Sequence, residues 1–96
     1  MTVLVDQALW WHRGERWCHL TSDASYDELH AFVEALGLGV PRRAFQGDHY
    51  DVPERFRQAV VGAGATEVGS RELLRRLKAA GLRLTPAERR ARRQTR

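Results

Sequence analysis

The sequence has a single cysteine and no long apolar run. Cys18 cannot form an internal disulfide, and this scarcity of cysteine fits a reducing compartment. No apolar stretch approaches the roughly 20 residues that a membrane-spanning helix needs. The first apolar run ends at Asp6, so the start of the chain lacks the long apolar centre of a secretory signal. We therefore expect a cytoplasmic protein that makes no contact with a membrane.

Several common functional signatures are also missing. The sequence has no glycine-rich phosphate loop, no GxSxG motif, no paired CxxC motif and no aromatic RNA-binding signature. Cys18 lies in an apolar stretch, where a cysteine is more often a small core residue than a nucleophile. Trp10, Trp11 and Trp17 could stack on bases, but packing a loop onto a small core is the more common role of such residues. A function must therefore be sought in less regular groups of polar residues.

The body of the chain lacks an excess of positive charge. The net charge is +4, yet residues 82–96 carry six arginines and one glutamate, whereas residues 1–81 carry ten basic and eleven acidic side chains. A basic tail attracts phosphates whatever their sequence, while a globular nucleic-acid reader needs a basic face on the fold itself. We therefore expect a single domain over residues 1–81 and a basic, arginine-rich C-terminal tail over residues 82–96.

Length and apolar patterning predict an α/β domain. A chain of 96 residues is large enough for one core, and 43% apolar with 29% charged residues is ordinary for a globular protein. The alternation of strand and helix patterns predicts a compact three-layer α/β sandwich, with a small, mostly parallel sheet of about four strands and three helices. Strands are expected at residues 3–5, 17–20, 43–46 and 66–68, helices at residues 25–36, 53–63 and 70–80, and a marginal helix or frayed tail from residue 85.

The clearest predicted helix begins at a capping box. Ser25 and Glu28 have the spacing in which the serine accepts from a first-turn N–H and the glutamate reaches back to the cap. His30 lies at the edge of the apolar stripe of this helix, where it can face a cleft as easily as solvent. Ser70 is expected to cap the third helix in the same way.

The densest group of polar residues is the run QGDHYDVP at residues 46–53. An extended backbone places alternate residues on one face, so His49 and Asp51 should point together while Asp48 and Tyr50 point away. An imidazole held by a carboxylate is a competent general base or a metal ligand with a fixed tautomer. In the alternative interpretation, Asp51 caps the helix that follows, because a glutamate stands three residues later, and His49 is exposed.

Asp6 is expected to face the same site. It directly follows the first predicted strand, and the functional crevice of a parallel sheet lies beyond the carboxyl ends of its strands. If the strands are parallel, Asp6 and residues 48–51 converge at one edge of the sheet. Asp6 is then a candidate metal ligand or general base, although it can also simply accept a backbone N–H from the next loop.

A divalent metal is one way in which these side chains could act. His30, His49 and Asp6, with His19, offer the nitrogen and oxygen ligands that a transition metal prefers. No pair of them has the close helical spacing that makes a metal motif specific. The metal set His30, His49 and Asp6 is therefore an expectation drawn from residue type more than from spacing.

Acid–base catalysis without a metal is the other possibility. His19 and His49 would act as an acid and base pair, with Asp6 and Asp51 completing the catalytic group. An anionic substrate would then need positively charged or hydroxyl-bearing partners. The candidates for substrate binding are Arg13, Tyr50 and Arg71.

Several spaced motifs resemble one known family. The chain is similar over residues 2–77 to domain of unknown function family 4031, small proteins of bacteria and their phages. The shared motifs fall on Asp6, Arg13-Gly14, Trp17 to Leu20, Glu28 to His30, Phe45-Gln46 and His49 to Val52. Where the family has a second aspartate this chain has Gln7, and its loop between Gln46 and Asp48 is shortened to Gly47. The resemblance implies a fold and a set of polar positions, and it brings no assigned activity.

These residues favour a small cytoplasmic hydrolase, of the phosphodiesterase kind, that acts on a nucleotide or nucleic acid through a His/Asp site. The alternative is a non-catalytic nucleic-acid or protein-binding module whose working part is the basic tail, with the histidines as polar core and capping groups. A third possibility is a homodimer formed through the surface of Trp10 and Trp11. The sequence alone does not identify the substrate, the metal or the oligomeric state.

Overall fold

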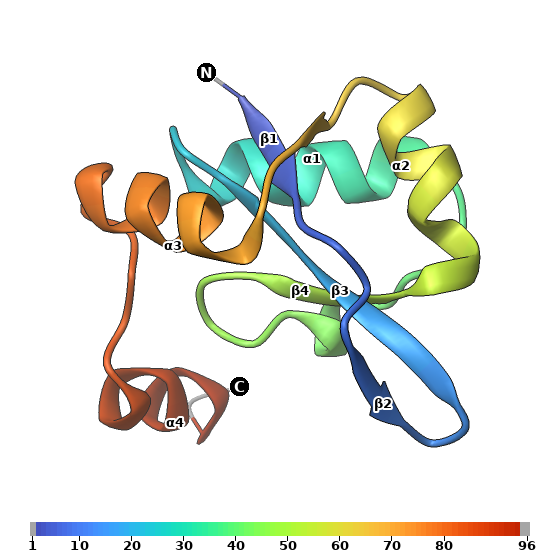
Figure 1. The fold of residues 1–96 in the computed structure, drawn as a ribbon. Helices are drawn as coiled ribbons and strands as arrows, with labels where there is room; N and C mark the ends of the chain where they lie inside the picture. The colour runs from blue at the N-terminus through green and yellow to red at the C-terminus, as the bar shows by residue number, and fades with distance from the viewer. Residues whose placement is uncertain (1, 95–96) are drawn as a thin grey trace.

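In the computed structural model, which describes residues 2–94 and the side chains of residues 2–91, a five-stranded mixed sheet packs with four α-helices (Figure 1). The strands are β1 (Val3–Val5), β2 (Trp10–His12), β3 (Glu15–Ser22), β4 (Tyr50–Pro53) and β5 (Thr66–Glu67). The α-helices are α1 (Tyr26–Leu36), α2 (Arg57–Gly62), α3 (Ser70–Ala79) and α4 (Pro86–Gln94), and two 3-10 helices are η1 (Arg42–Ala44) and η2 (Glu54–Phe56). No helix within the described range is long and apolar enough to cross a membrane.

β3 runs through the middle of the sheet. β1 and β2 pair antiparallel with its two halves along one edge, and β4 pairs antiparallel along the other edge. Only the pairing of β5 with β1 is parallel. The α/β class is therefore confirmed, while the prediction of a mostly parallel sheet is wrong. One reason is the two-residue turn of Arg13 and Gly14, since a parallel neighbour needs a much longer crossover connection.

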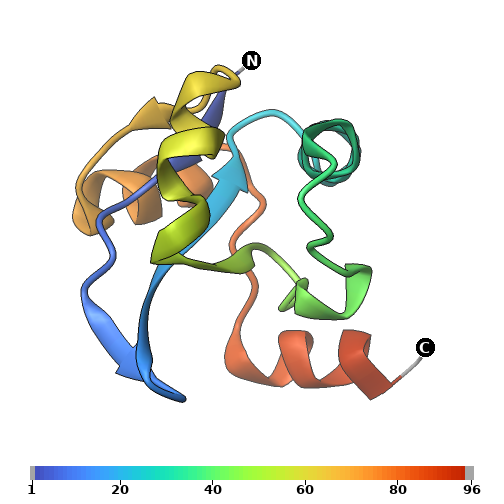
Figure 2. The ribbon, with the colours of Figure 1, turned by 90° about the vertical axis from the view of Figure 1, so that its right-hand side faces the viewer.

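Alternation along β3 separates two faces of the sheet. Cys18 and Leu20 are fully buried in the main core, which they share with Leu29 of α1. His19 and Thr21 alternate with them and point to the opposite face, where they contact Asp6 and Asp48. α3 lies over that face, while α1 covers the first one (Figures 1 and 2). His19 and Thr21 of β3 are thus on the side of the sheet away from α1.

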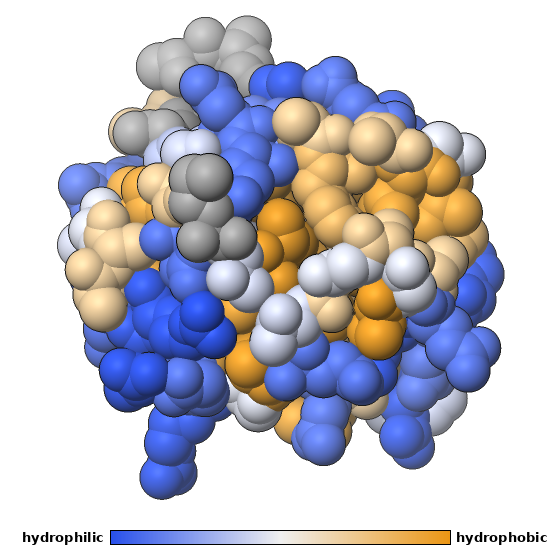
Figure 3. Space-filling view, turned by 90° about the horizontal axis from the view of Figure 1, so that it is seen from above, coloured by the Kyte–Doolittle hydropathy of each residue, from blue (hydrophilic) through white to orange (hydrophobic). Residues whose placement is uncertain are grey.

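The helices show the expected amphipathic patterns. Ser25 caps α1 by accepting from the Glu28 N–H at 3.0 Å, as its capping box predicts, although the Glu28 carboxylate accepts from Ser22 instead of reaching back. In α3, Leu73 and Leu77 are buried. Seen from the end where β1 begins, hydrophilic residues gather on the side of α3, and an apolar patch lies on the opposite side (Figure 3).

Two predicted elements are corrected by the structure. Residues 43–46 do not form a strand: η1 turns tightly there, with the Ala44 N–H donating to the Pro41 carbonyl, and only Phe45 bridges to Tyr50. No α-helix begins at Pro53, because that residue ends β4 and is followed by η2 before α2 starts at Arg57. The run 46–53 therefore enters the sheet.

Candidate metal centre

His19 is held at a break between β1 and β2. These strands pair with the two ends of β3, and Asp6 lies in the gap between them. The Asp6 N–H donates to the His19 carbonyl at 3.2 Å, while the His19 N–H donates to Oδ1 of Asp6 at 2.6 Å, so a side-chain oxygen takes the place of a ladder carbonyl. Nδ1 of His19 lies 2.7 Å from Oδ2 of the same carboxylate. Because a carboxylate accepts, Nδ1 carries the proton and Nε2 is left for a ligand.

Asp6 is an orienting group in this arrangement. It is 1% exposed, and its Oδ2 also accepts from the Ser70 hydroxyl at 2.8 Å. Ser70 does not cap α3, since Gly69 occupies the cap position and has no side chain to offer. Both oxygens of Asp6 thus accept hydrogen bonds, two from His19 and one from Ser70. These donors explain why a strand-end aspartate is buried here, and they leave no oxygen of Asp6 free for an ion.

His49 is held by a second carboxylate. Its Nδ1 lies 2.6 Å from Oδ1 of Asp48, and its Nε2 lies 3.2 Å from Oδ1 of Asp51. The predicted pairing of His49 with Asp51 is therefore present. The prediction that Asp48 points away is wrong, because β4 begins only at Tyr50 and Gly47 has a φ of +99°, so strand alternation does not extend back to Asp48.

Asp48 is fully buried and receives donors from a distant part of the chain. Its Oδ2 accepts from the Leu84 N–H at 2.9 Å, and the guanidinium groups of Arg83 and Arg89 lie 3.6 Å away. The Thr21 hydroxyl donates to its backbone carbonyl at 2.8 Å. The start of the predicted basic tail therefore belongs to the site. α4 lies beneath the loop that precedes β4 and contains Asp48 (Figures 1 and 2).

These contacts shift the acidity of both groups. Burial alone would raise the pKa of Asp48, but hydrogen bonds from His49 and the Leu84 N–H lower it below the ordinary value of 3.8. Burial alone would lower the pKa of His49, but hydrogen bonds to Asp48 and Asp51 raise it above 6.5. Asp48 therefore favours the ionised form beside His49, and its negative charge in turn favours a proton on the imidazole.

Three ligand atoms converge between the two supported histidines. One atom each of His19, His49 and Asp51 lies within 4.8 Å of the others, and no other group of three such side chains occurs within the described part of the chain. The two imidazole rings are 5.0 Å apart in an edge-on arrangement. A tetrahedral ion with bonds of about 2.0 Å separates its ligand atoms by about 3.3 Å, close to the distance between His49 and Asp51.

Asp51 does not act as a helix cap. The helical turn after β4 is capped by Pro53, and α2 by Phe56, neither of which offers a side-chain cap. The carboxylate of Asp51 instead faces His49 from the neighbouring position on the sheet, where it also stands opposite His19 across the β3–β4 ladder. The capping interpretation is therefore wrong for this residue.

His30 and Tyr50 lie on the other face of the sheet. Nδ1 of His30 is 2.7 Å from the hydroxyl of Tyr50, which is 1% exposed and belongs to the main core. Burial and the nearby Arg42 lower the pKa of His30 below 6.5. The sheet separates this pair from His49, so the structure does not assemble the predicted metal set, and we leave His30 and Tyr50 out of the site.

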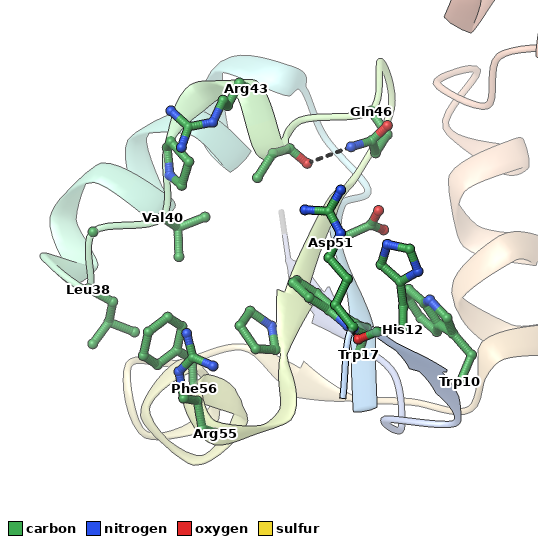
Figure 4. A pocket seen from close by; sticks show the side chains of 15 residues that line it. Trp10, His12, Trp17, Leu38, Val40, Arg43, Gln46, Asp51, Arg55 and Phe56 are labelled. Atoms are coloured by element: carbon green, nitrogen blue, oxygen red, sulfur yellow. Dashed lines mark hydrogen bonds between the residues drawn. The ribbon is translucent and has the colours of Figure 1, made fainter. Parts of the chain in front are cut away.

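A cleft of about 580 Å³ adjoins the three ligand atoms (Figure 4). Asp51 and Trp10 line both regions, since the Trp10 ring also stacks on His19 at 4.5 Å between centroids. Of the two arginines predicted to bind substrate, Arg13 lines the cleft, whereas Arg71, on the first turn of α3, does not. The other lining residues are His12, Trp17, Leu38, Gly39, Val40, Pro41, Arg43, Ala44, Gln46, Pro53, Arg55 and Phe56.

Cys18 has no part in this site. It is fully buried, and its thiol donates to the Val52 carbonyl at 3.3 Å. Burial, with the nearby Asp6 charge, raises the pKa of the Cys18 thiol to about 12. A thiol that stays protonated is a poor nucleophile and a poor metal ligand, so the interpretation as a core residue fits.

Sequence reasoning missed Ser70, Asp48 and the Leu84 N–H. Ser70 matches the pattern of a helix cap, and a backbone N–H gives no sequence signal at all. Asp48 stands directly before His49, and that adjacency was the one available signal of a carboxylate partner. Each of these groups is far from its partner along the chain or outside a regular element.

Comparison with known proteins yields one match. The model of a family described as "Protein of unknown function (DUF4031)" matches residues 3–80. This range contains the two histidines, their carboxylates and Ser70, and it ends before Leu84 and Arg89. No curated protein and no solved structure matches the chain.

Proposed function

The chain belongs to the family described as "Protein of unknown function (DUF4031)", and from the geometry of its site we propose that it is a hydrolase that depends on a divalent transition metal and cleaves phosphate esters. The observation that carries this proposal is the convergence of His19, His49 and Asp51 within 4.8 Å. Two imidazoles and one carboxylate suit first-row ions such as Zn²⁺. We place the activity in the cytoplasm, in keeping with the lone, buried Cys18.

The groups behind the histidines support this proposal. In metal sites, a ligating imidazole donates its second N–H to a carboxylate, which fixes the tautomer and the ring orientation. Here Asp6 takes that role for His19 and Asp48 takes it for His49. Two histidines held in this way, with a ligand atom of each within 4.8 Å of the Asp51 carboxylate, are more specific than a chance cluster of polar residues.

The number of ligands favours catalysis over a structural role. Structural zinc sites use four protein ligands, whereas catalytic sites use three and keep a position for water or substrate. A bound ion would supply an acidified water and polarise a phosphoryl oxygen. Around it, Asp6 and Asp48 keep the imidazoles in place, and Arg13 offers a positive charge to the substrate in the adjoining cleft.

Metal binding by single-histidine variants tests the proposal. We expect the protein to bind Co²⁺ or Zn²⁺ in titration calorimetry, and the Co²⁺ complex to show visible absorption typical of nitrogen and oxygen ligands. His49→Ala should lower the affinity at least about 100-fold, because a lost ligand costs more than a lost supporting contact. The rate at which this variant hydrolyses a chromogenic phosphodiester should fall together with its metal affinity.

His30→Ala is the matched control, since it removes an imidazole from the opposite face of the sheet. It should keep the metal affinity of the unmodified chain. Circular dichroism and thermal melting of both variants separate a lost ligand from a lost fold. Equal metal binding by the folded His49→Ala variant would overturn the proposal.

The alternative function is a binding module that uses the basic tail. Deleting residues 83–96 would not test this alternative cleanly, because the deletion also removes the donors of Asp48. Replacing Arg90, Arg92, Arg93 and Arg96 by glutamine leaves Arg83 and Arg89 in place. A tail-driven binder should then lose its salt-dependent binding to nucleic acid, while a hydrolase should keep its turnover.

A further inference from the structure

The cleft beside the metal centre has a polar end and an apolar end. Asp51, Gln46 and His12 lie at one end in Figure 4, and Leu38 and Phe56 lie at the other, where the Arg55 guanidinium packs over the Phe56 ring. Small-ligand pockets are mainly apolar, with a few polar groups that set orientation, and they occupy about 300 to 1,000 Å³. At about 580 Å³ this cleft falls within that range. The polar end of the cleft is the end that contains Asp51, one of the three ligand residues. A bound molecule would therefore place its polar group at that end.

Two arginines of the cleft are available to an anion. Arg55 is engaged, because its Nη1 lies 2.6 Å from both carboxylate oxygens of Glu15. No carboxylate among the described residues pairs with Arg13 or Arg43. A guanidinium binds phosphate oxygens in a bidentate manner, which makes such unpaired arginines good phosphate partners. The cleft is therefore positive in charge as well as partly apolar.

Aromatic rings add a third feature. Trp17 and Trp10 line the cleft near its polar end, and Phe56 lines its apolar end. Flat aromatic side chains are the usual partners of nucleobases, since every base has a face that can stack. The ring of Trp17 is fixed in place because its Nε1–H donates to the His12 carbonyl at 2.8 Å.

We propose that the cleft binds a nucleoside monophosphate or the terminal nucleotide unit of a small phosphate ester, with its phosphate held by Arg13 and Arg43 and its base against the aromatic and apolar lining of the cleft. The inference rests on the proposed function, because it names the substrate class of the same site. A sugar phosphate would leave the apolar end unfilled. A nucleic-acid strand would need a basic track that continues beyond the cleft, yet Arg83 and Arg89 of the tail face the Asp48 carboxylate.

Binding measurements in EDTA test the inference separately from the metal. Titration calorimetry, or fluorescence of the lining tryptophans, is carried out with adenosine monophosphate, ribose 5-phosphate, adenosine and a thymidine octamer. We expect the monophosphate to bind at least about 10-fold more tightly than ribose 5-phosphate or adenosine, because stacking and phosphate pairing each contribute roughly that much. The octamer should bind no more tightly than the monophosphate.

Two cleft variants and one control sharpen the test. Arg43→Gln should weaken binding of the monophosphate about 10-fold and leave adenosine unchanged, because only the phosphate contact is lost. Leu38→Glu should weaken the binding of both adenosine monophosphate and adenosine. Arg75→Gln, on the exposed side of α3 where Arg75 pairs with Glu72, should change neither. Circular dichroism checks that each variant is folded.

Failure of either proposal can be recognised. If adenosine monophosphate shows the expected preference while the protein binds no metal, the cleft assignment stands and the hydrolase proposal fails. If metal binds at His19, His49 and Asp51 but the monophosphate binds no more tightly than ribose 5-phosphate, the cleft assignment is overturned. Tighter binding of the octamer than of the monophosphate also overturns it.

Discussion

At the scale of single residues, the site depends on two buried carboxylates. A buried charge is expensive unless it is paired and hydrogen-bonded. Asp6 accepts from a backbone N–H, an imidazole and a hydroxyl, and Asp48 accepts from an imidazole and a backbone N–H with two guanidinium groups nearby. Both groups are satisfied only when their histidines hold one orientation, so the fold itself pre-orients His19 and His49.

Arg13 is a residue held in a costly conformation. With a φ of +53°, it is the one non-glycine residue in the described range with a positive φ, and Gly14 follows with +79°. This is the two-residue hairpin turn in which asparagine or glycine is favoured at both central positions. An arginine here costs roughly 1 kcal/mol. Such strain is understandable if the guanidinium serves the cleft that it lines.

Replacing Arg13 should therefore stabilise the protein and weaken its ligand binding. We expect Arg13→Asn to raise the free energy of unfolding by about 0.5 to 1 kcal/mol, measured by urea denaturation. Affinity for adenosine monophosphate should fall in the same variant. Arg16→Asn, on the same hairpin but without a positive φ, is the control and should not raise stability. An unchanged or lower stability of Arg13→Asn would show that the turn is not strained.

At the scale of elements, the site is a meeting point of segments distant in sequence. β3 supplies His19, the β4 strand and its preceding loop supply Asp51 and His49, and the start of α3 supplies Ser70. The segment between α3 and α4 adds the Leu84 N–H, and Leu84 is itself 9% exposed. A Cβ on Gly47 would approach the Arg89 side chain to 3.1 Å, so this loop and α4 are in close contact.

Truncation tests whether the segment after α3 supports the site. A chain that ends at Gly81 loses the Leu84 N–H, Arg83 and Arg89 from Asp48. We expect its free energy of unfolding to fall by about 1 to 3 kcal/mol, because a buried carboxylate is left with fewer donors. Its metal affinity should fall about 10- to 100-fold, as for other lost supporting contacts.

A chain that ends at Ala91 is the matched control for this truncation. It keeps all three contacts to Asp48 while removing arginines beyond them. Its stability should stay within about 0.5 kcal/mol of the full chain in urea denaturation, and its metal titration should be unchanged. If the two truncations behave alike, residues 82–91 do not support Asp48.

At the scale of the whole molecule, one carboxylate joins the residue before β1 to α3. Asp23 accepts from the Thr2 N–H at 2.8 Å and from Arg76 of α3 at 2.6 Å. Partial burial alone would raise the pKa of Asp23, but these donors lower it below 3.8. A carboxylate with a lowered folded-state pKa stabilises the fold above its unfolded pKa, and this contribution is lost as the pH falls through the folded value.

Asp23→Asn should therefore destabilise the protein in a pH-dependent way. Above about pH 5 we expect a loss of roughly 1 kcal/mol, since a partly exposed ion pair and a hydrogen bond are weakened. The difference from the unmodified chain should shrink as the pH falls below about 4, when Asp23 itself becomes protonated. Urea denaturation between pH 3 and pH 7 measures this, and a difference that does not vary with pH would contradict it.

The surface of the molecule also bears on its assembly. Leu9 is 64% exposed and Trp11 is 66% exposed, with the Arg16 guanidinium over the Trp11 ring. Trp10, by contrast, turns inward to stack on His19. A homodimer through this surface stays a prediction, and it would now involve Leu9 and Trp11, with sedimentation as its measurement.

Much of the local structure could be predicted from the sequence. The strand at residues 3–5, the cap at Ser25 and the end of the first helix at Leu36 all depend on neighbouring residues, and each is present. The strand at residues 43–46 and the helix from Pro53 failed because short apolar runs are ambiguous without their partners. Pairing of His49 with Asp51 followed from spacing, whereas the roles of Asp48 and Ser70 did not.

The sequence by itself determined the class of fold, the first helix and which side chains carry chemistry, because propensity, capping and alternation are local properties. Only the tertiary structure decided which of those side chains meet. The sheet places His19 with Asp51 on one face and His30 with Tyr50 on the other, and the break between β1 and β2 brings Asp6 to His19. Strand register and the return of the chain after α3 are long-range events, so the site they assemble was not readable from spacing alone.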